Sequence, residues 1–229
     1  MRSRLPLPPE LRREVYRYLL VLRNPICLPP AMRHINRKDG WVNEEINTAV
    51  LLVSRQVSEE ALDALYGENV FEIVLHARSD ILIEIAPANR QRIRRLQLAV
   101  RPFGIFYGLP LDPDSQIWPR ILANLTKLSI VAQQPRKSQF PDTSLEQEVN
   151  KWLTWLKPIL EYVNQSVSSG IVVEVDHNDC KETSELIKEC LPNRCRKVQN
   201  RTGDVYFERG EFRFVSRRTI ADLADFFSL

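Results

Sequence analysis

The chain has little glycine and no long apolar run, and each shortage excludes a class of function. Seven scattered glycines in 229 residues leave room for neither glycine-rich fingerprint of nucleotide-binding loops. No apolar stretch approaches the roughly 20 residues that a membrane-spanning helix needs. The catalytic signatures Gly-x-Ser-x-Gly and His-Glu-x-x-His are also absent. We therefore expect a non-enzymatic protein without a cofactor or a membrane span.

Cysteine and histidine are scarce as well. Four cysteines at uneven spacing do not make a disulfide framework in a chain of this length, so we expect a reduced compartment, cytoplasmic or nuclear. A zinc site would have to combine His177, Cys180, Cys190 and Cys195, whose spacings match no paired zinc knuckle. The stretch 176–180 (Asp-His-Asn-Asp-Cys) follows an expected strand and is the best enzymatic candidate. Its acids and asparagine are also typical of a tight turn, which is the interpretation we favour.

The chain also has little excess of positive over negative charge. The formal net charge is +3, which is too small to indicate a polyanionic partner by itself. One cluster, Arg90, Arg92, Arg94 and Arg95, has no acid among it and could contact phosphate groups. The same cluster could be a solvated rim at the start of a strand, and no aromatic platform of the RNA-recognition type accompanies it. Nucleic-acid binding is therefore the weaker interpretation.

What the sequence does contain is a strongly marked helix near its N-terminus. Prolines at positions 8 and 9 favour a first helical turn, and Glu10 lies where the helix dipole favours a carboxylate. The spacing predicts a helix to about Leu22. Its apolar stripe consists of Leu11, Val15, Tyr18, Leu19 and Leu22. Its opposite side carries Arg12, Arg13 and Arg17.

Helical spacing resumes at residues 49–65, after a proline-containing connection over 23–45. Ser54 or Ser58 could divide this run into two helices, and Gly67 is placed to end it. The spacing predicts that Leu52 and Val57 belong to the core. Residues 70–75 then alternate as a half-buried strand does.

The amino-acid identities in these two segments are more specific than the helical spacing of their apolar residues. The first block reads Leu7-Pro8-Pro9-Glu10-Leu11, followed by Arg12-x-x-Val15-Tyr16-x-x-Leu19-Leu20. The second block contains Leu51-Leu52-Val53-Ser54-Arg55-Gln56-Val57, Glu60-Ala61, Leu65-Tyr66 and Asn69-Val70-Phe71. Together they resemble the F-box-like domain in the variant abundant in filamentous fungi, over about residues 5–75, with Ser54 where that pattern has cysteine.

The remainder of the chain alternates strands with helices. Leu96 and Leu128 begin two similar Leu-x-Leu or Leu-x-Ile strands 32 positions apart. A third strand is expected at 171–175, after a long helical segment with Pro158 as an expected kink or break. This alternation predicts a mostly parallel sheet and an α/β fold, with mixed α+β as the alternative. The units resemble degenerate leucine-rich-type repeats, but the asparagine ladder of true repeats is absent, so we favour an irregular α/β layer. Near the C-terminus, residues 205–214 are expected to form a β-hairpin.

Taken together, these patterns predict an F-box-like helical module over 1–75, with a 23–45 insertion, packed on an α/β target-recognition domain over 76–229. By resemblance, the module would dock the Skp-type adaptor protein of a cullin-type ubiquitin ligase, and the second domain would bind an unknown target. The residues that match the docking helix are Leu7, Pro8, Glu10, Leu11, Val15 and Leu19. A structural interaction module with no ubiquitin role is the main alternative, and a basic nucleic-acid-binding protein is the lesser one.

Overall fold

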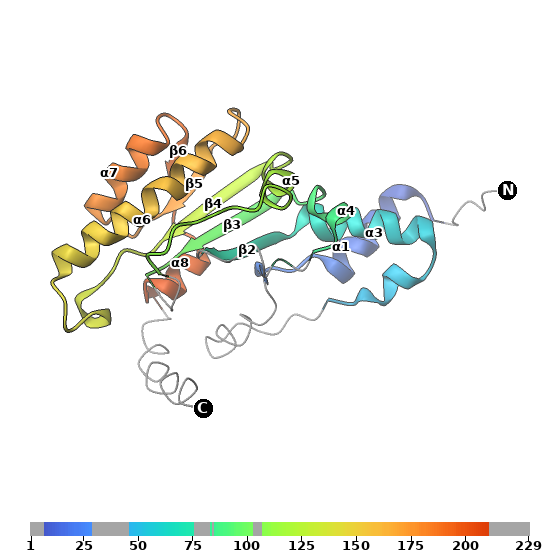
Figure 1. Ribbon diagram of the computed structural model, residues 1–229. Coiled ribbons are helices and arrows are strands. Elements are labelled where there is room, and N and C mark those ends of the chain that lie inside the picture. The colour runs from blue at the N-terminus through green and yellow to red at the C-terminus, as the bar shows by residue number, and fades with distance from the viewer. Residues whose placement is uncertain (1–6, 29–45, 76–82, 84, 103–106, 211–229) are drawn as a thin grey trace, which may run out of the picture.

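A six-stranded parallel sheet forms the centre of the computed structural model, which describes residues 7–28, 46–75, 83, 85–102 and 107–210 (Figure 1). The strands lie side by side in the order in which they occur along the chain. They are β1 (Ile26–Leu28), β2 (Val70–Leu75), β3 (Arg95–Val100), β4 (Lys127–Ala132), β5 (Val173–Asp176) and β6 (Cys195–Lys197). Every neighbouring pair is parallel, which confirms the expected α/β class.

The register of the sheet follows the repeated leucine pattern. Leu96 of β3 pairs with Phe71 on one side and with Leu128 on the other, so positions 32 apart in sequence are neighbours in space. Because side chains alternate along a strand, Leu98 and Ile130 lie on the same face as these residues. All five side chains are buried in one large apolar cluster.

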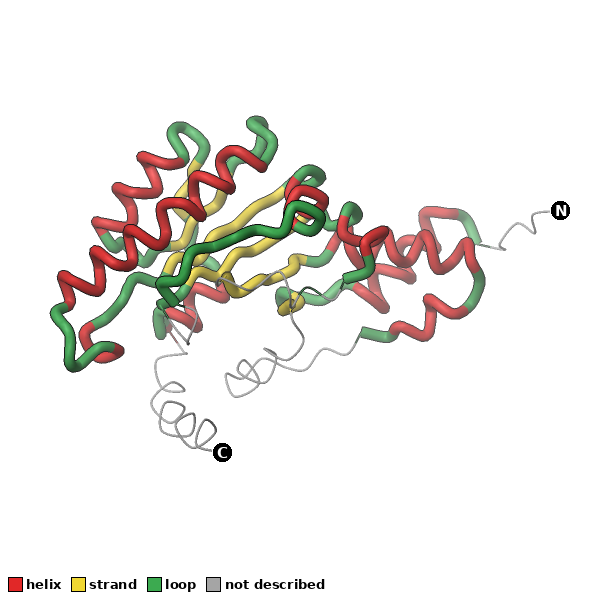
Figure 2. The backbone as a smooth tube through the Cα atoms, in the orientation of Figure 1, coloured by secondary structure: helices red, strands yellow, loops and turns green. Residues whose placement is uncertain are grey.

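Helices cover that apolar face (Figures 1 and 2). The connections contain α4 (Pro87–Arg90), α5 (Trp118–Leu122), η5 (Lys137–Gln139), α6 (Leu145–Ser166) and α7 (Lys181–Cys190). Pro158 lies inside α6, which nevertheless continues as one helix, so the expected break is wrong. Trp152 of α6 is fully buried and its Nε1 donates to Thr183 Oγ1 of α7 at 3.1 Å, which ties the two covering helices together.

A short helix, α8 (Arg201–Tyr206), lies on the other face of the sheet (Figure 1). The expected hairpin is therefore wrong in its first strand, and residues 211–214 lie outside the described residues. Asn200 starts the helix, because its side-chain oxygen accepts from the Gly203 N–H at 2.7 Å. Tyr206 and the following Phe207, whose spacing with Val205 suggested a strand, pack on β3 and β4 from the helix.

Three helical segments extend from one end of the sheet as a lobe (Figure 1). They are α1 (Pro9–Leu20), the 3-10 helix η3 (Thr48–Leu52) and α3 (Arg55–Glu68), and we call them the N-terminal lobe. Ser54 divides η3 from α3, since its hydroxyl accepts from the Val57 N–H at 3.2 Å. Val57 is buried as predicted, whereas Leu52 is 87% exposed, so its assignment to the core was wrong.

The lobe and the sheet share one core. Leu20 of α1 and Ala61 of α3 belong to the same apolar cluster as Phe71 and Leu98 of the sheet. The expected connection over 23–45 contains strand β1, and its residues 29–45 lie outside the described residues. Both β1 and β2, from the first 75 residues, are therefore strands of the common sheet. No helix in the described parts of the chain has the length and apolar composition that crossing a bilayer requires.

Candidate partner-binding surface

Helix α1 meets α3 through charged side chains. Arg12 donates to both carboxylate oxygens of Glu60, from Nε at 2.8 Å and from Nη2 at 2.7 Å. The buried Tyr16 hydroxyl donates to the same carboxylate at 3.1 Å. The hydrogen bond from Arg12 is the main reason that the pKa of Glu60 falls from 4.5 to about 2. Glu60 is thus an ionised acceptor for two residues of α1.

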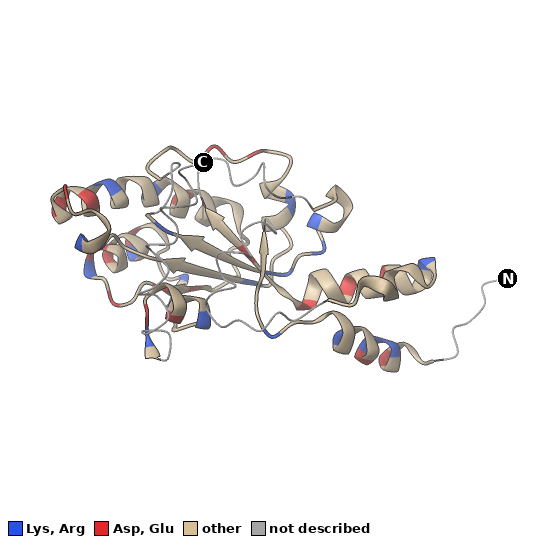
Figure 3. Cartoon of the chain, turned by 90° about the horizontal axis from the view of Figure 1, so that it is seen from below, with Lys and Arg blue, Asp and Glu red and all other residues tan. Residues whose placement is uncertain are grey.

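A second acid extends this interface toward the end of α3. Glu68 pairs with Arg13 at 2.9 Å and with Arg17 at 2.8 Å, and Figure 3 shows both basic and acidic residues on the helices of the lobe. Arg12 packs against α3 too, with only 11% of its side chain exposed. The sequence predicted that these arginines lie opposite the apolar stripe of α1, and they do. The side of α1 that contacts α3 is nevertheless the one that carries the arginines.

Asn69 joins the ends of the two helices. Its amide nitrogen donates to the carbonyl oxygens of Leu20 at 2.9 Å and Leu65 at 2.8 Å. Its amide oxygen accepts from the Leu22 N–H at 2.8 Å. Only a side chain that both donates and accepts can satisfy these three groups at once. The structure thus brings the first sequence block into direct contact with the second.

Part of the apolar stripe of α1 faces outward, whereas Leu19 and Leu22 of the same stripe pack against the shared core. The exposed fractions are 54% for Leu11, 44% for Val15 and 89% for Tyr18. Of the nine large apolar residues that are exposed in the described part of the chain, six lie between positions 7 and 53. These six, which we call the outer apolar set, are Leu7, Leu11, Val15, Tyr18, Leu52 and Val53. Such a concentration marks an interaction surface more often than scattered exposed residues do.

The structure places five of the six expected docking residues on the outside. Leu7, Leu11 and Val15 are exposed, as are Pro8 and Glu10 at the start of α1. Leu19 is the exception, since it is half-buried and packs against the shared core. The sequence reasoning did not select Tyr18, Leu52 or Val53. The signal for Leu52 and Val53 was the run of three apolar residues at 51–53, because a single helical turn cannot bury all three side chains.

A groove of about 610 Å³ opens on the arginine side of the lobe. Its lining includes Arg13, Tyr16, Glu60, Asp63, Glu68, Arg92 and Arg94. Charges of both signs meet there, and Arg92 forms ion pairs with Glu59 and Asp63 of α3. The groove is therefore neither a cationic nor an apolar binding site.

The other members of the expected arginine cluster also donate within the chain. Arg90 Nε donates to the Ile85 carbonyl at 2.9 Å, and Arg94 Nη1 to the Gln91 carbonyl at 2.6 Å. Arg95 Nη1 donates to the Glu68 carbonyl at 3.1 Å, which links the first residue of β3 to the end of α3. Arg95 thus connects β3 to α3, whereas Arg90 and Arg94 bond carbonyls close to them in the sequence.

The stretch 176–180 forms the expected tight turn after β5. Asn178 and Asp179 adopt positive φ angles of 49° and 59°. Asp176 is almost fully buried and forms an ion pair with Arg209. Burial lowers the pKa of His177, which favours the neutral ring. In the described residues, no three His, Cys, Asp or Glu side chains are grouped so that they could hold a metal ion.

The outer apolar set is the strongest candidate site on these observations. It lies on a lobe whose inner contacts use Arg12, Tyr16, Glu60 and Asn69, all from the two sequence blocks. No family model matches the chain, and neither a curated protein nor a solved structure does.

Proposed function

We propose that this protein is a non-enzymatic adaptor of the F-box-like type. Its N-terminal lobe would dock a Skp-type protein of a cullin-type ubiquitin ligase, and its sheet would bind a target protein. One observation carries the proposal: residues of the two motif blocks bind each other inside the lobe, while apolar residues of the same blocks remain outside.

The distribution of charge and apolar surface supports docking over a purely structural role. A helix that only closed a core would turn its leucines inward and its arginines to water. Here α1 buries Tyr16 and Leu20 but also turns Arg12 inward onto Glu60. Leu11 and Tyr18 of the same helix face solvent. Exposed apolar area gains roughly 25 cal/mol per Å² when a partner covers it. A few large side chains at the centre of such an interface supply most of the binding energy.

The sheet supports the second half of the proposal. Its sequential parallel order and the 32-position repeat agree with degenerate leucine-rich-type units. Units of that kind each contact only their neighbours and build an extended surface. An extended surface beside a docking lobe suits a protein that holds a target next to a ligase.

Co-elution with a Skp-type protein of the same organism tests the proposal. The purified chain at micromolar concentration should form a heterodimer in size-exclusion chromatography, and Leu11→Asp should abolish it without changing the circular dichroism. Leu109→Asp is the matched control, because Leu109 is 48% exposed but lies outside the lobe. A folded chain that forms no complex supports the structural-module alternative and rejects the adaptor.

A further inference from the structure

The face of the sheet that α8 covers carries a row of polar side chains in register across all six strands. The row consists of Cys27, Glu72, Gln97, Ser129, Glu174 and Arg196. Two residues further along each strand, the next row on this face consists of Val74, Ala99 and Val131 and ends in an acid, Asp176 of β5. A sheet face that only needed covering would be apolar, as the opposite face is. The polar row and Asp176 together suit this face to groups that carry hydrogen-bond donors or positive charge.

Residues 200–209, which we call the strap, already occupy part of this face. Glu72 is 1% exposed and accepts from two strap hydroxyls, Thr202 Oγ1 at 3.0 Å and Tyr206 OH at 2.9 Å. Gln97 donates to the same carboxylate and to the Thr202 hydroxyl. Burial raises the pKa of Glu72 despite these donors. The strap thus satisfies a carboxyl group that would otherwise be open to other donors.

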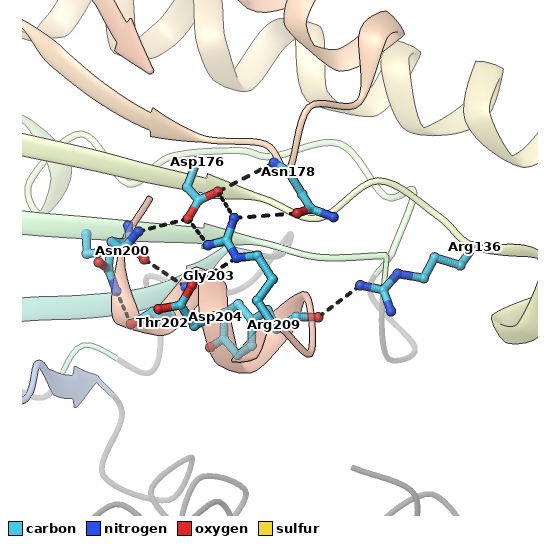
Figure 4. A network of polar contacts seen from close by, with 10 residues as sticks. Arg136, Asp176, Asn178, Asn200, Thr202, Gly203, Asp204 and Arg209 are labelled. Carbon is cyan, nitrogen blue, oxygen red and sulfur yellow. Dashed lines mark hydrogen bonds and ion pairs between the residues drawn. The ribbon is translucent and has the colours of Figure 1, made fainter. Parts of the chain in front are cut away.

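A cation forms the second attachment of the strap (Figure 4). Arg209 donates to both oxygens of Asp176, from Nη2 at 2.6 Å and from Nη1 at 3.0 Å. The Asn200 N–H donates to Asp176 at 3.0 Å. Gly203 lies so close that a Cβ there would be 2.0 Å from Asp176 Oδ2. A side chain at position 203 therefore fits only if the strap or the Asp176 side chain moves.

The strap packs fewer apolar side chains on the sheet than the helices on the opposite face do. Tyr206 and Phe207 pack on Ala99 and Val131, whereas α6 and α7 bury a continuous apolar layer on the opposite face. A helix of six residues is not stable by itself, so the strap depends on its hydrogen bonds to the sheet. It is held in the way that a bound peptide is held, by donors that meet fixed acceptors.

We propose that this polar face is a binding surface for a peptide segment of a partner protein, and that the strap is its resident occupant. The acceptors are Glu72 and Asp176, so the segment must carry hydroxyl donors and a cation, as Tyr206 and Arg209 do in the strap. A competing segment binds when the strap detaches. This inference deepens the target-binding half of the proposed function, and its test involves no Skp-type protein.

The test uses the full chain with Gly203→Ala, whose methyl group should displace the strap from Asp176 and leaves every strand residue unchanged. Hydrogen exchange of the amides at 201–207 should accelerate about tenfold or more, while the amides of β3 and β4 keep their protection. A fluorescent peptide of residues 199–210 should then bind the variant with micromolar affinity and should not bind the unaltered chain. The same peptide carrying Arg209→Ala should bind at least about tenfold more weakly.

Two results would overturn the inference. One is a freed strap with no peptide binding, which would mean that the polar face recognises nothing. The other is that Gly203→Ala and, separately, Arg209→Ala in the full chain both accelerate exchange throughout the sheet, because the strap would then be an inseparable part of the fold.

Discussion

The N-terminal lobe and the sheet place their apolar residues in opposite ways. On the face of the sheet that α6 and α7 cover, Leu98 and Ile130 are buried and at most 1% exposed. In the lobe, α1 meets α3 through Arg12 and Glu60 and turns Leu11 to solvent. The sheet is therefore stabilised by what the chain itself buries. The lobe leaves part of its apolar surface exposed to solvent, and each prediction below tests this difference.

The largest effect should come from truncating a core residue of the sheet. Leu98→Ala should lower the free energy of unfolding by about 2–5 kcal/mol, because it leaves a cavity among packed side chains. Leu11→Ala, the same change in the lobe, should alter it by less than about 0.5 kcal/mol. Urea denaturation of both variants measures the comparison. Equal losses would mean that the outer side of α1 is covered.

A smaller loss should follow removal of the amide that joins α1 to α3. Asn69→Ala should lower the free energy of unfolding by about 1–3 kcal/mol, because it leaves buried backbone groups of Leu20, Leu22 and Leu65 without partners. Thermal denaturation checks the size of the loss. An unchanged melting temperature would show that these three bonds contribute little to holding α1 against α3.

The lobe should also be the acid-sensitive region. The pKa of Glu60 is about 2 in the folded chain against an ordinary value of 4.5. Its contribution to stability is therefore complete above about pH 4.5 and is lost as the pH falls toward 2. Glu60→Gln should flatten the stability profile between these values. A profile that keeps its slope in the variant would assign the acid sensitivity to other groups.

Glu72, under the strap, should act with the opposite sign. Burial raises its pKa above the ordinary value, so the folded chain binds this proton more tightly than the unfolded chain does. Its effect makes stability fall as the pH rises above 4.5, and Glu72→Gln should remove that fall. Stability profiles of the two glutamine variants, measured side by side, should diverge in opposite directions.

The smallest effect should come from the arginine rim. Arg94→Ala combined with Arg95→Ala should change the free energy of unfolding by no more than about 1 kcal/mol, since both side chains bond exposed backbone carbonyls. The unaltered chain should not bind RNA or DNA at low salt. Tight binding that weakens steeply with salt would instead favour the polyanion interpretation.

Local signals in the sequence predicted the elements that depend on them. The prolines predicted the start of α1, and Ser54 was one of two serines expected to divide η3 from α3. The repeated leucine pattern predicted the strands that contain Leu96 and Leu128. Strand β1 was missed because three residues between prolines carry no period. Helix α8 was missed because Val205 and Phe207 alternate as strand residues do. Tertiary contact with the sheet decided its conformation.

The candidate site was predicted only in part. The period of α1 identified an apolar stripe but could not tell whether the chain or a partner covers it. That depends on Glu60 and Glu68, which are 44 or more positions away and pair with the arginine side. The same limit explains Leu52, whose helical spacing fits a core position although the 3-10 turn directs it outward.

Isothermal titration of the chain with a Skp-type protein of its organism tests the central claim most directly. If the outer apolar set is a docking surface, the two proteins should bind with a dissociation constant of about 1 μM or tighter. The heat-capacity change should be negative, because apolar surface becomes buried. Leu11→Asp should remove the signal, and Leu109→Asp should leave it unchanged. Absence of binding by the folded chain, or equal binding by the Leu11→Asp variant, would contradict the claim.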